Sequence, residues 1–71
     1  MIELDVRGLP PPEPFEQIMQ ALETLPQRGT LRVLIHREPY PLYEILRDMG
    51  YCHQTTLLAD GNFSINIQLM T

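Results

Sequence analysis

The sequence has a single cysteine and no long apolar run, and both shortages limit what the protein can be. With Cys52 alone, an intramolecular disulfide is impossible, which favours a reducing compartment. No stretch approaches the roughly 20 consecutive apolar residues that a membrane-spanning helix requires. The first five residues are acidic and alternate in polarity, unlike a signal peptide or a transit peptide. The sequence therefore predicts a cytoplasmic protein without a membrane association.

Basic residues are also scarce. The chain has five of them, all arginine, against nine acidic residues, and its formal charge is −4. A nucleic-acid binder gains most of its affinity from basic residues that face phosphates. A nucleic-acid partner is therefore not expected.

The length of 71 residues leaves room for only one hydrophobic core, so we expect a single domain over residues 1–71. A domain of this size buries only about 60% of the surface that its unfolded chain exposes. Its stability should therefore be marginal. Small domains that have no disulfide or bound metal are often stabilised by association with a partner. Binding to another protein or to a neighbouring domain, or a weak homo-oligomer, suits this size.

Hydrophobic periodicity predicts a strand, a helix and a second strand in the first half of the chain. Residues 2–6 alternate in polarity, which is typical of a strand with one buried face. The proline cluster of residues 10–14 suits the first turn of a helix. Behind it, apolar residues recur at helical spacing, namely Phe15, Ile18, Met19, Leu22 and Leu25. Pro26 and Gly29 end this helix, and residues 31–35 alternate again as a more central strand.

The second half predicts a helix followed by a hairpin. Glu38-Pro39-Tyr40-Pro41 marks the start of the helix, and Gly50 suits the left-handed position after its end. The apolar stripe of this helix is Leu42, Ile45, Leu46 and Met49. Thr55, Leu57 and Ala59 share one face of the next strand. Asp60-Gly61 predicts a two-residue hairpin loop, and residues 63–69 alternate strictly.

The predicted fold is an α/β two-layer sandwich of order βαβαββ, with a mixed four-stranded sheet and both helices on one face. The first two strands, joined by a crossover helix, should be parallel, and the last two should form an antiparallel hairpin. The other face of the sheet should meet solvent or a partner. It carries Glu3, Asp5, Arg32, Ser64, Asn66 and Gln68.

Several short motifs resemble the TusA and SirA-like sulfur-carrier family, whose signature is Gly-Leu, one residue, then Cys-Pro-x-Pro. They are Leu4-Asp5, Gly8-Leu9, Pro12-Glu13-Pro14, Gly29-Thr30 and the glycine at position 50. The resemblance covers the whole chain in element order and implies the same two-layer sandwich. In that family the cysteine accepts a persulfide sulfur and relays it, for instance toward tRNA thiolation or cofactor synthesis.

The chain departs from that signature at the cysteine. The corresponding residue is Pro11, which has no nucleophile to activate. The stretch from Arg37 to Tyr43 instead resembles an uncharacterised sister group of TusA that lacks the cysteine, a domain of unknown function. This resemblance explains the loss of the thiol and implies no activity. No catalytic residue, cofactor or metal is predicted.

The candidate functional surface is the sheet edge at which the first two strands end, because α/β sheets usually place ligands there. Helix N-termini at such an edge favour anions. Here, however, prolines remove backbone donors, and glutamates already lie near the positive end of the dipole of the first helix. The candidate residues are Arg7, Pro11, Pro12, Glu13, His36, Arg37, Glu38, Tyr40 and Tyr43.

Two interpretations of this edge stay open. It is either a rigid start for the helices, with Arg7 or Arg37 paired to a local glutamate, or a surface that recognises a protein. Rigid prolines lose little entropy on docking, and Tyr and Arg are common interface anchors. An exposed Tyr43 would favour association.

Cys52 and His53 form a second candidate, because a thiolate beside an imidazole can be nucleophilic or can bind metal. Adjacent residues of a strand point to opposite faces, however, so the two side chains would not share a site. A structural cysteine is the simpler interpretation. No pair of His, Cys or Glu has ligand spacing on one element, which disfavours zinc.

The sequence therefore favours a non-catalytic binding or adaptor module. The alternative is a sulfur-handling protein that carries persulfide on Cys52. A redox-linked sensor of a small ligand or a metal is a third hypothesis, which rests only on the resemblance.

Overall fold

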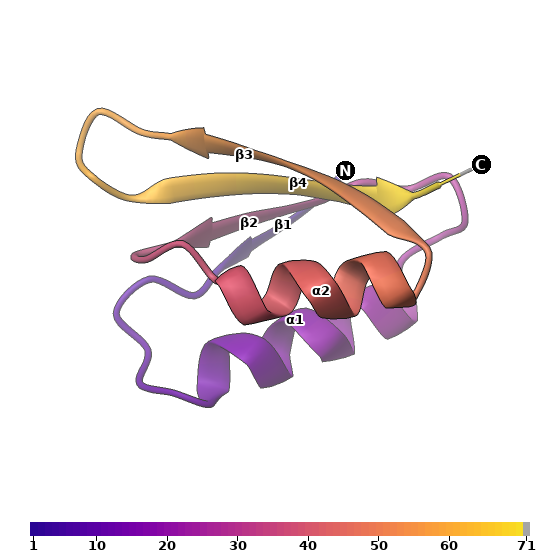
Figure 1. Cartoon of the computed structure of the whole chain (residues 1–71), viewed down its shortest axis with the longest axis horizontal. Coiled ribbons are helices and arrows are strands. Elements are labelled where there is room, and N and C mark those ends of the chain that lie inside the picture. Colours follow the sequence, from indigo (N-terminus) through magenta and orange to yellow (C-terminus); the bar gives the residue numbers. More distant parts are fainter. Residues whose placement is uncertain (71) are drawn as a thin grey trace.

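The structure is a computed structural model that describes residues 1–70, and it confirms the predicted α/β sandwich (Figure 1). The elements in chain order are β1 (Ile2–Asp5), α1 (Glu13–Thr24), β2 (Leu31–Ile35), α2 (Tyr40–Asp48), β3 (Tyr51–Leu57) and β4 (Phe63–Leu69). Within residues 1–70, no helix is long and apolar enough to cross a membrane.

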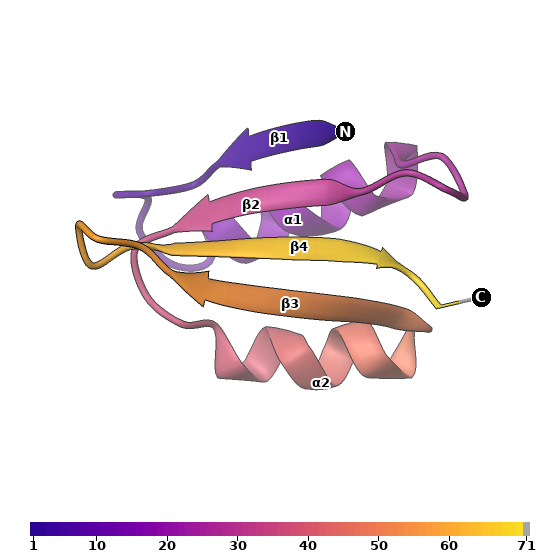
Figure 2. The ribbon, with the colours of Figure 1, turned by 90° about the horizontal axis from the view of Figure 1, so that it is seen from above.

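The four strands form one mixed sheet in the order β1-β2-β4-β3 (Figure 2). β1 is parallel to β2, whereas β4 is antiparallel to both of its neighbours. The register places Leu4 beside Val33 and Val33 beside Ile65, so one face of the sheet collects aliphatic side chains across three strands. The parallel pair and the antiparallel hairpin agree with the sequence-based prediction.

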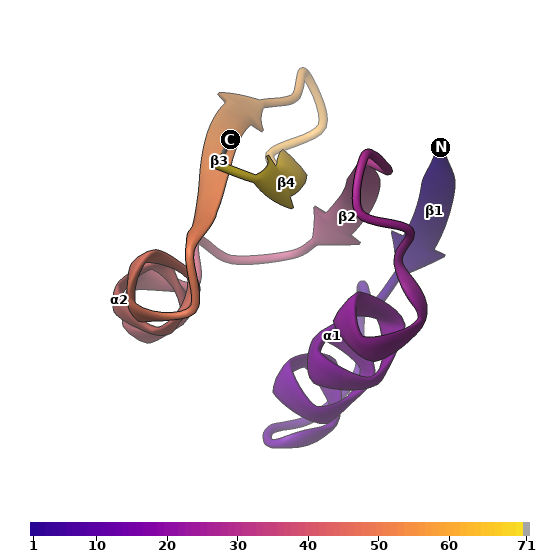
Figure 3. The same ribbon diagram turned by 90° about the vertical axis from the view of Figure 1, so that its right-hand side faces the viewer.

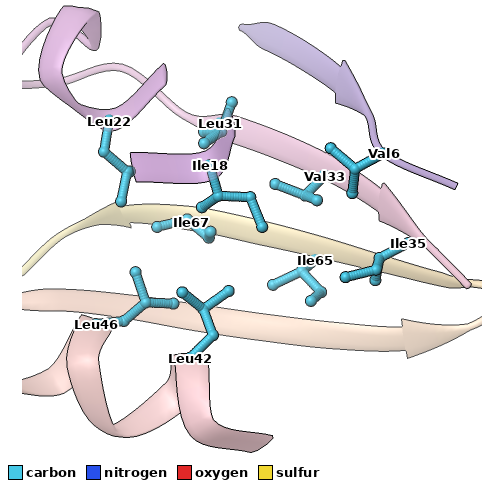
Figure 4. Packing of buried hydrophobic residues seen from close by; sticks show 10 residues of the cluster. All are labelled: Val6, Ile18, Leu22, Leu31, Val33, Ile35, Leu42, Leu46, Ile65 and Ile67. Atoms are coloured by element: carbon cyan, nitrogen blue, oxygen red, sulfur yellow. The ribbon is translucent and has the colours of Figure 1, made fainter. Parts of the chain in front are cut away.

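Both helices pack on the aliphatic face, as predicted (Figure 3). The ten buried apolar residues come mostly from the central strands and from one stripe of each helix (Figure 4). They are Val6, Ile18, Leu22, Leu31, Val33, Ile35, Leu42, Leu46, Ile65 and Ile67. Two residues of the predicted stripes are exposed instead of buried: Phe15 is 39% exposed, and Met49, the C-cap of α2, is 48% exposed.

The opposite face of the sheet is polar, as the alternation predicted. Glu3, Arg32 and Asn66 are neighbours across three strands on this face. Ser64 is the buried exception, since its hydroxyl accepts a hydrogen bond of 3.1 Å from the Nε of Arg32.

The loop between β3 and β4 is longer than the predicted two-residue hairpin. The amide of Gly61 donates to the carbonyl of Leu58, and the amide of Leu58 donates to the carbonyl of Asn62. Gly61 has a φ of +88°, but Asp60 does not have a positive φ. A type I′ loop needs positive φ at both central residues, so this is the three-residue loop that ends on a left-handed glycine. Ala59 therefore lies in the turn and not on β3.

Candidate functional site

An apolar groove lies at the edge where β1 and β2 end and where α1 and α2 begin. The two connections that leave the sheet there are on the left of Figure 1. The groove has a volume of about 250 Å³. We call it the proline groove; it is lined by Leu9, Pro11, Pro12, Pro14, Phe15, Ile18, Ile35, His36, Arg37, Pro39, Pro41 and Leu42.

Prolines fix the start of both helices around the groove. Pro12 is the N-cap of α1 and Pro39 is the N-cap of α2, and each helix has a further proline in its first turn. Neither cap makes a side-chain hydrogen bond. Because proline has a fixed φ and no N–H, these starts are rigid and poor in backbone donors. Glu13 and Glu16 also occupy the first turn of α1. The groove therefore suits apolar groups, and the two helix starts offer few backbone donors to an anion.

His36 joins the two connections that border the groove. The amide of Gly8 donates a hydrogen bond of 3.3 Å to the Nδ1 of His36. Gly8 has a φ of +77°, which a side chain would rarely adopt. This contact fixes the β1–α1 connection to the end of β2, so His36 has a positioning role in addition to lining the groove.

Arg7 makes a local ion pair outside the groove. Its Nη2 lies 2.7 Å from Oδ2 of Asp5, and its Nε donates to Oδ1 at 2.9 Å. These hydrogen bonds lower the pKa of Asp5 to about 2 and raise the pKa of Arg7. The prediction of a local glutamate as the partner is wrong for Arg7, because the neighbouring aspartate on the same sheet edge gives two-point contact.

Glu38 binds two tyrosines and thereby draws them away from the groove. Its carboxylate accepts the hydroxyl of Tyr40 at 2.9 Å and the hydroxyl of Tyr43 at 3.0 Å. Tyr43 also lies 2.6 Å from the hydroxyl of Thr55, and its ring stacks on His53 with a centroid distance of 4.1 Å. The hydrogen bond to Glu38 raises the pKa of Tyr40, and burial is the main cause that raises the pKa of Tyr43.

Tyr43 is therefore a packing residue between α2 and β3. It is half-buried against the core and does not line the groove. Its exposure would have favoured association, but α2 lies under the outer edge of the sheet and turns this side chain toward β3. Tyr40, in contrast, is 67% exposed.

The structure brings together only part of the predicted surface. Pro11, Pro12, His36 and Arg37 line the groove, whereas Glu13, Glu38 and Tyr40 lie in the segments that flank it. Sequence reasoning missed the apolar walls, above all Phe15 and Leu9. The prolines at the start of α2 were a usable signal, since they repeat the pattern at the start of α1.

Cys52 lies on the other face of the sheet and at its other end. It pairs with Gln68, and its Sγ donates to the carbonyl of Gln68 at 3.4 Å. His53 pairs with the buried Ile67 and so points to the helix side. The side chains of Cys52 and His53 therefore point to opposite faces of the sheet, as predicted. Among residues 1–70, no group of three His, Cys, Asp or Glu could hold a metal ion.

The sandwich and its groove define a fold of the SirA-like type. A SirA-like protein from Desulfitobacterium hafniense, known from its crystal structure, is similar with a TM-score of 0.81. The likeness covers 94% of this chain and 95% of that chain, at 24% sequence identity. The profile of the uncharacterized conserved protein family DUF2249 matches residues 3–68, and the chain belongs to this family. No curated protein matches the chain.

Proposed function

We propose that this protein is a non-catalytic, cytoplasmic binding or adaptor module that docks another protein, or a neighbouring domain, through the proline groove. The supporting observation is the groove itself: a preformed apolar hollow without a Cys, Ser, Thr or Lys among its lining residues. Pro11 lines it at the position where sulfur carriers of similar sequence have their cysteine. A site with largely apolar walls and no hydroxyl, thiol or amine side chain suits binding better than covalent catalysis.

The size of the groove favours a protein side chain over a free small molecule. Pockets for drug-sized ligands occupy roughly 300–1,000 Å³, and this groove has about 250 Å³. One aromatic or large aliphatic side chain of a partner is the kind of anchor that such a hollow accepts. Because the prolines are rigid before docking, little conformational entropy is lost on binding.

The charges on the α1 side of the groove favour a partner with a basic residue next to its apolar anchor, although Arg37 lines the opposite side. Glu13 and Glu16 flank the groove residue Phe15 in the first turn of α1, and both are exposed. The net charge of the protein is −4. Complementary charges at the rim of an interface mainly raise the association rate and the specificity.

A photo-crosslinking amino acid at position 15 tests this proposal in the native host. Position 20, which is also exposed on α1 but does not line the groove, is the matched control. We expect one protein to be crosslinked from position 15 and not from position 20. The proposal fails if neither position captures a protein and the purified chain does not self-associate at tens of micromolar.

A further inference from the structure

The outer edge of β3 is open along its whole length, and it differs from the other edge of the sheet. β1 is only four residues long and carries two carboxylates, Glu3 and Asp5, which protect an edge from unwanted pairing. β3 has seven residues and no charged residue, proline or glycine. It therefore has none of the usual protection of an edge strand.

The hydrogen-bond register shows which groups of β3 are unpaired. The amide of Leu58 donates to Asn62 just beyond one end of the ladder, and the amide of Met70 donates to Gly50 at the other. In an antiparallel pair these contacts alternate, so Cys52, Gln54 and Thr56 bond to β4. The outward N–H and C=O groups belong to Tyr51, His53, Thr55 and Leu57. Within residues 1–70, these groups have no backbone partner.

A hollow runs beside this edge between β3 and α2. Its volume is about 370 Å³. Tyr43, Glu44 and Arg47 of α2 form one wall, and the start of β3, from Tyr51 to His53, forms the other, with Met70 beside them. The side chain of Cys52 itself points to the opposite face. Seen from above, α2 lies beyond β3, beneath the position that a fifth strand would take (Figure 2). Every second side chain of a strand added there would face the α2 side, where Tyr43 and Tyr51 offer aromatic contacts and Glu44 and Arg47 offer charged ones.

We propose that the edge of β3 docks an extended segment of a partner protein as a fifth strand of the sheet. The segment would have about seven residues that alternate between apolar and polar, because its inward side chains would meet Tyr51, the Tyr43–His53 stack and Leu57. Leu57 is 67% exposed, and a strand at this edge would cover it. Its outward side chains would continue the polar face that Gln54 and Thr56 begin. This surface shares no residue with the proline groove, so it is independent of the proposed function.

The position of α2 disfavours a second copy of this chain as the occupant. In an antiparallel pair of β3 strands, both α2 helices would lie on the same face beside the twofold axis. Neighbouring strands are about 4.8 Å apart, whereas packed helices need about 8–10 Å between their axes. The two helices would collide. The edge is therefore open to a bare strand and closed to a strand that has its own helix beneath it.

A displayed library of seven-residue peptides with alternating apolar and polar positions tests the proposal on the full chain. Scrambled peptides of the same composition are the control. We expect the selected peptides to slow amide hydrogen exchange at Tyr51, His53, Thr55 and Leu57 by at least about tenfold, with little change at Cys52, Gln54 and Thr56. A peptide that binds elsewhere on the protein would not give this odd-even pattern.

A pair of variants at Leu57 separates the backbone contact from the side-chain contact. Leu57→Pro removes one outward donor and leaves the ladder to β4 intact, whereas Leu57→Ala keeps that donor. We expect Leu57→Pro to bind selected peptides at least about fivefold more weakly than Leu57→Ala. If Leu57→Pro does not fold, the exchange pattern of the wild type still decides. Three results overturn the proposal. The library gives no enrichment over scrambled peptides, the protected amides lie elsewhere, or a higher protein concentration without peptide gives the same odd-even protection.

Discussion

The two ends of the sheet offer opposite chemistry although they share one core. At the end where β1 and β2 finish, rigid prolines surround an apolar groove. At the other end, Cys52 lies on the polar face beside Gln68. The first end has an apolar groove without a Cys, Ser, Thr or Lys among its lining residues, whereas the thiol at the second end points to the polar face. In this chain, the proline groove and the thiol therefore lie at opposite ends of the sheet.

The largest effect should come from breaking the core on which both ends depend. Leu46 is fully buried, so Leu46→Ala should lower the free energy of unfolding by about 2–5 kcal/mol. That loss is comparable to the whole stability of so small a domain. Urea denaturation should show a largely unfolded variant.

Met49→Ala is the matched control for this core substitution. Met49 is 48% exposed on the same helix, so its replacement should cost less than about 1 kcal/mol. Equal losses for the two variants would contradict the assignment of the core.

The two tyrosines on Glu38 should differ in what they contribute to stability. Tyr43→Phe removes contacts to both Glu38 and Thr55 from a half-buried hydroxyl, and should cost about 1–2 kcal/mol. Tyr40→Phe removes one contact of an exposed hydroxyl and should cost less than about 0.5 kcal/mol. Thermal unfolding of the two variants measures the difference. A larger loss for Tyr40→Phe would mean that Tyr43 is not the link between α2 and β3.

A thiol moved to the proline end should be more reactive than the natural one. Position 11 is exposed, whereas Cys52 is partly buried and donates to a carbonyl. The double variant Pro11→Cys, Cys52→Ser should fold, with a stability within about 1 kcal/mol of the wild type. Its thiol should react with a disulfide reagent at least about tenfold faster than Cys52 does. A faster reaction at Cys52 would reopen the sulfur-handling alternative.

The smallest effect should be the acid dependence that Asp5 contributes. Its pKa is lowered to about 2 by Arg7, against an unfolded value near 3.8. The ion pair therefore stabilises the fold above pH 4, and this contribution is lost as the pH falls from about 4 to 2. Asp5→Asn should show a slightly shallower loss of stability over this range. The difference should be small and should decrease with salt, because both side chains are exposed.

Most of the fold could be predicted because each element has a clear period. Residues 63–69 alternate without interruption, and Ile18 and Leu22 mark the buried side of α1. The length of the hairpin loop could not be predicted, since Asp-Gly occurs both in two-residue loops and at the end of three-residue loops. Only the hydrogen bond from Leu58 to Asn62 distinguishes them.

The location of the groove could be predicted from the sequence, but most of the residues that line it could not. Its walls come from two distant stretches of the chain, residues 9–18 and 35–42, and Phe15 has the spacing of a core residue although it lies at the open end of α1. The inward turn of Tyr43 depends on α2 lying under the sheet edge, which no local pattern encodes. The open edge of β3 likewise follows from the strand order β1-β2-β4-β3, which requires knowledge of the pairing.

The most direct test compares both ends in one binding measurement. With the partner captured from position 15, the affinities of wild type, Phe15→Asp and Cys52→Ser can be measured by calorimetry. We predict that Phe15→Asp, which puts a carboxylate into the apolar groove, weakens binding at least about tenfold, and that Cys52→Ser binds like the wild type. Unchanged affinity for Phe15→Asp together with a loss for Cys52→Ser would contradict the account.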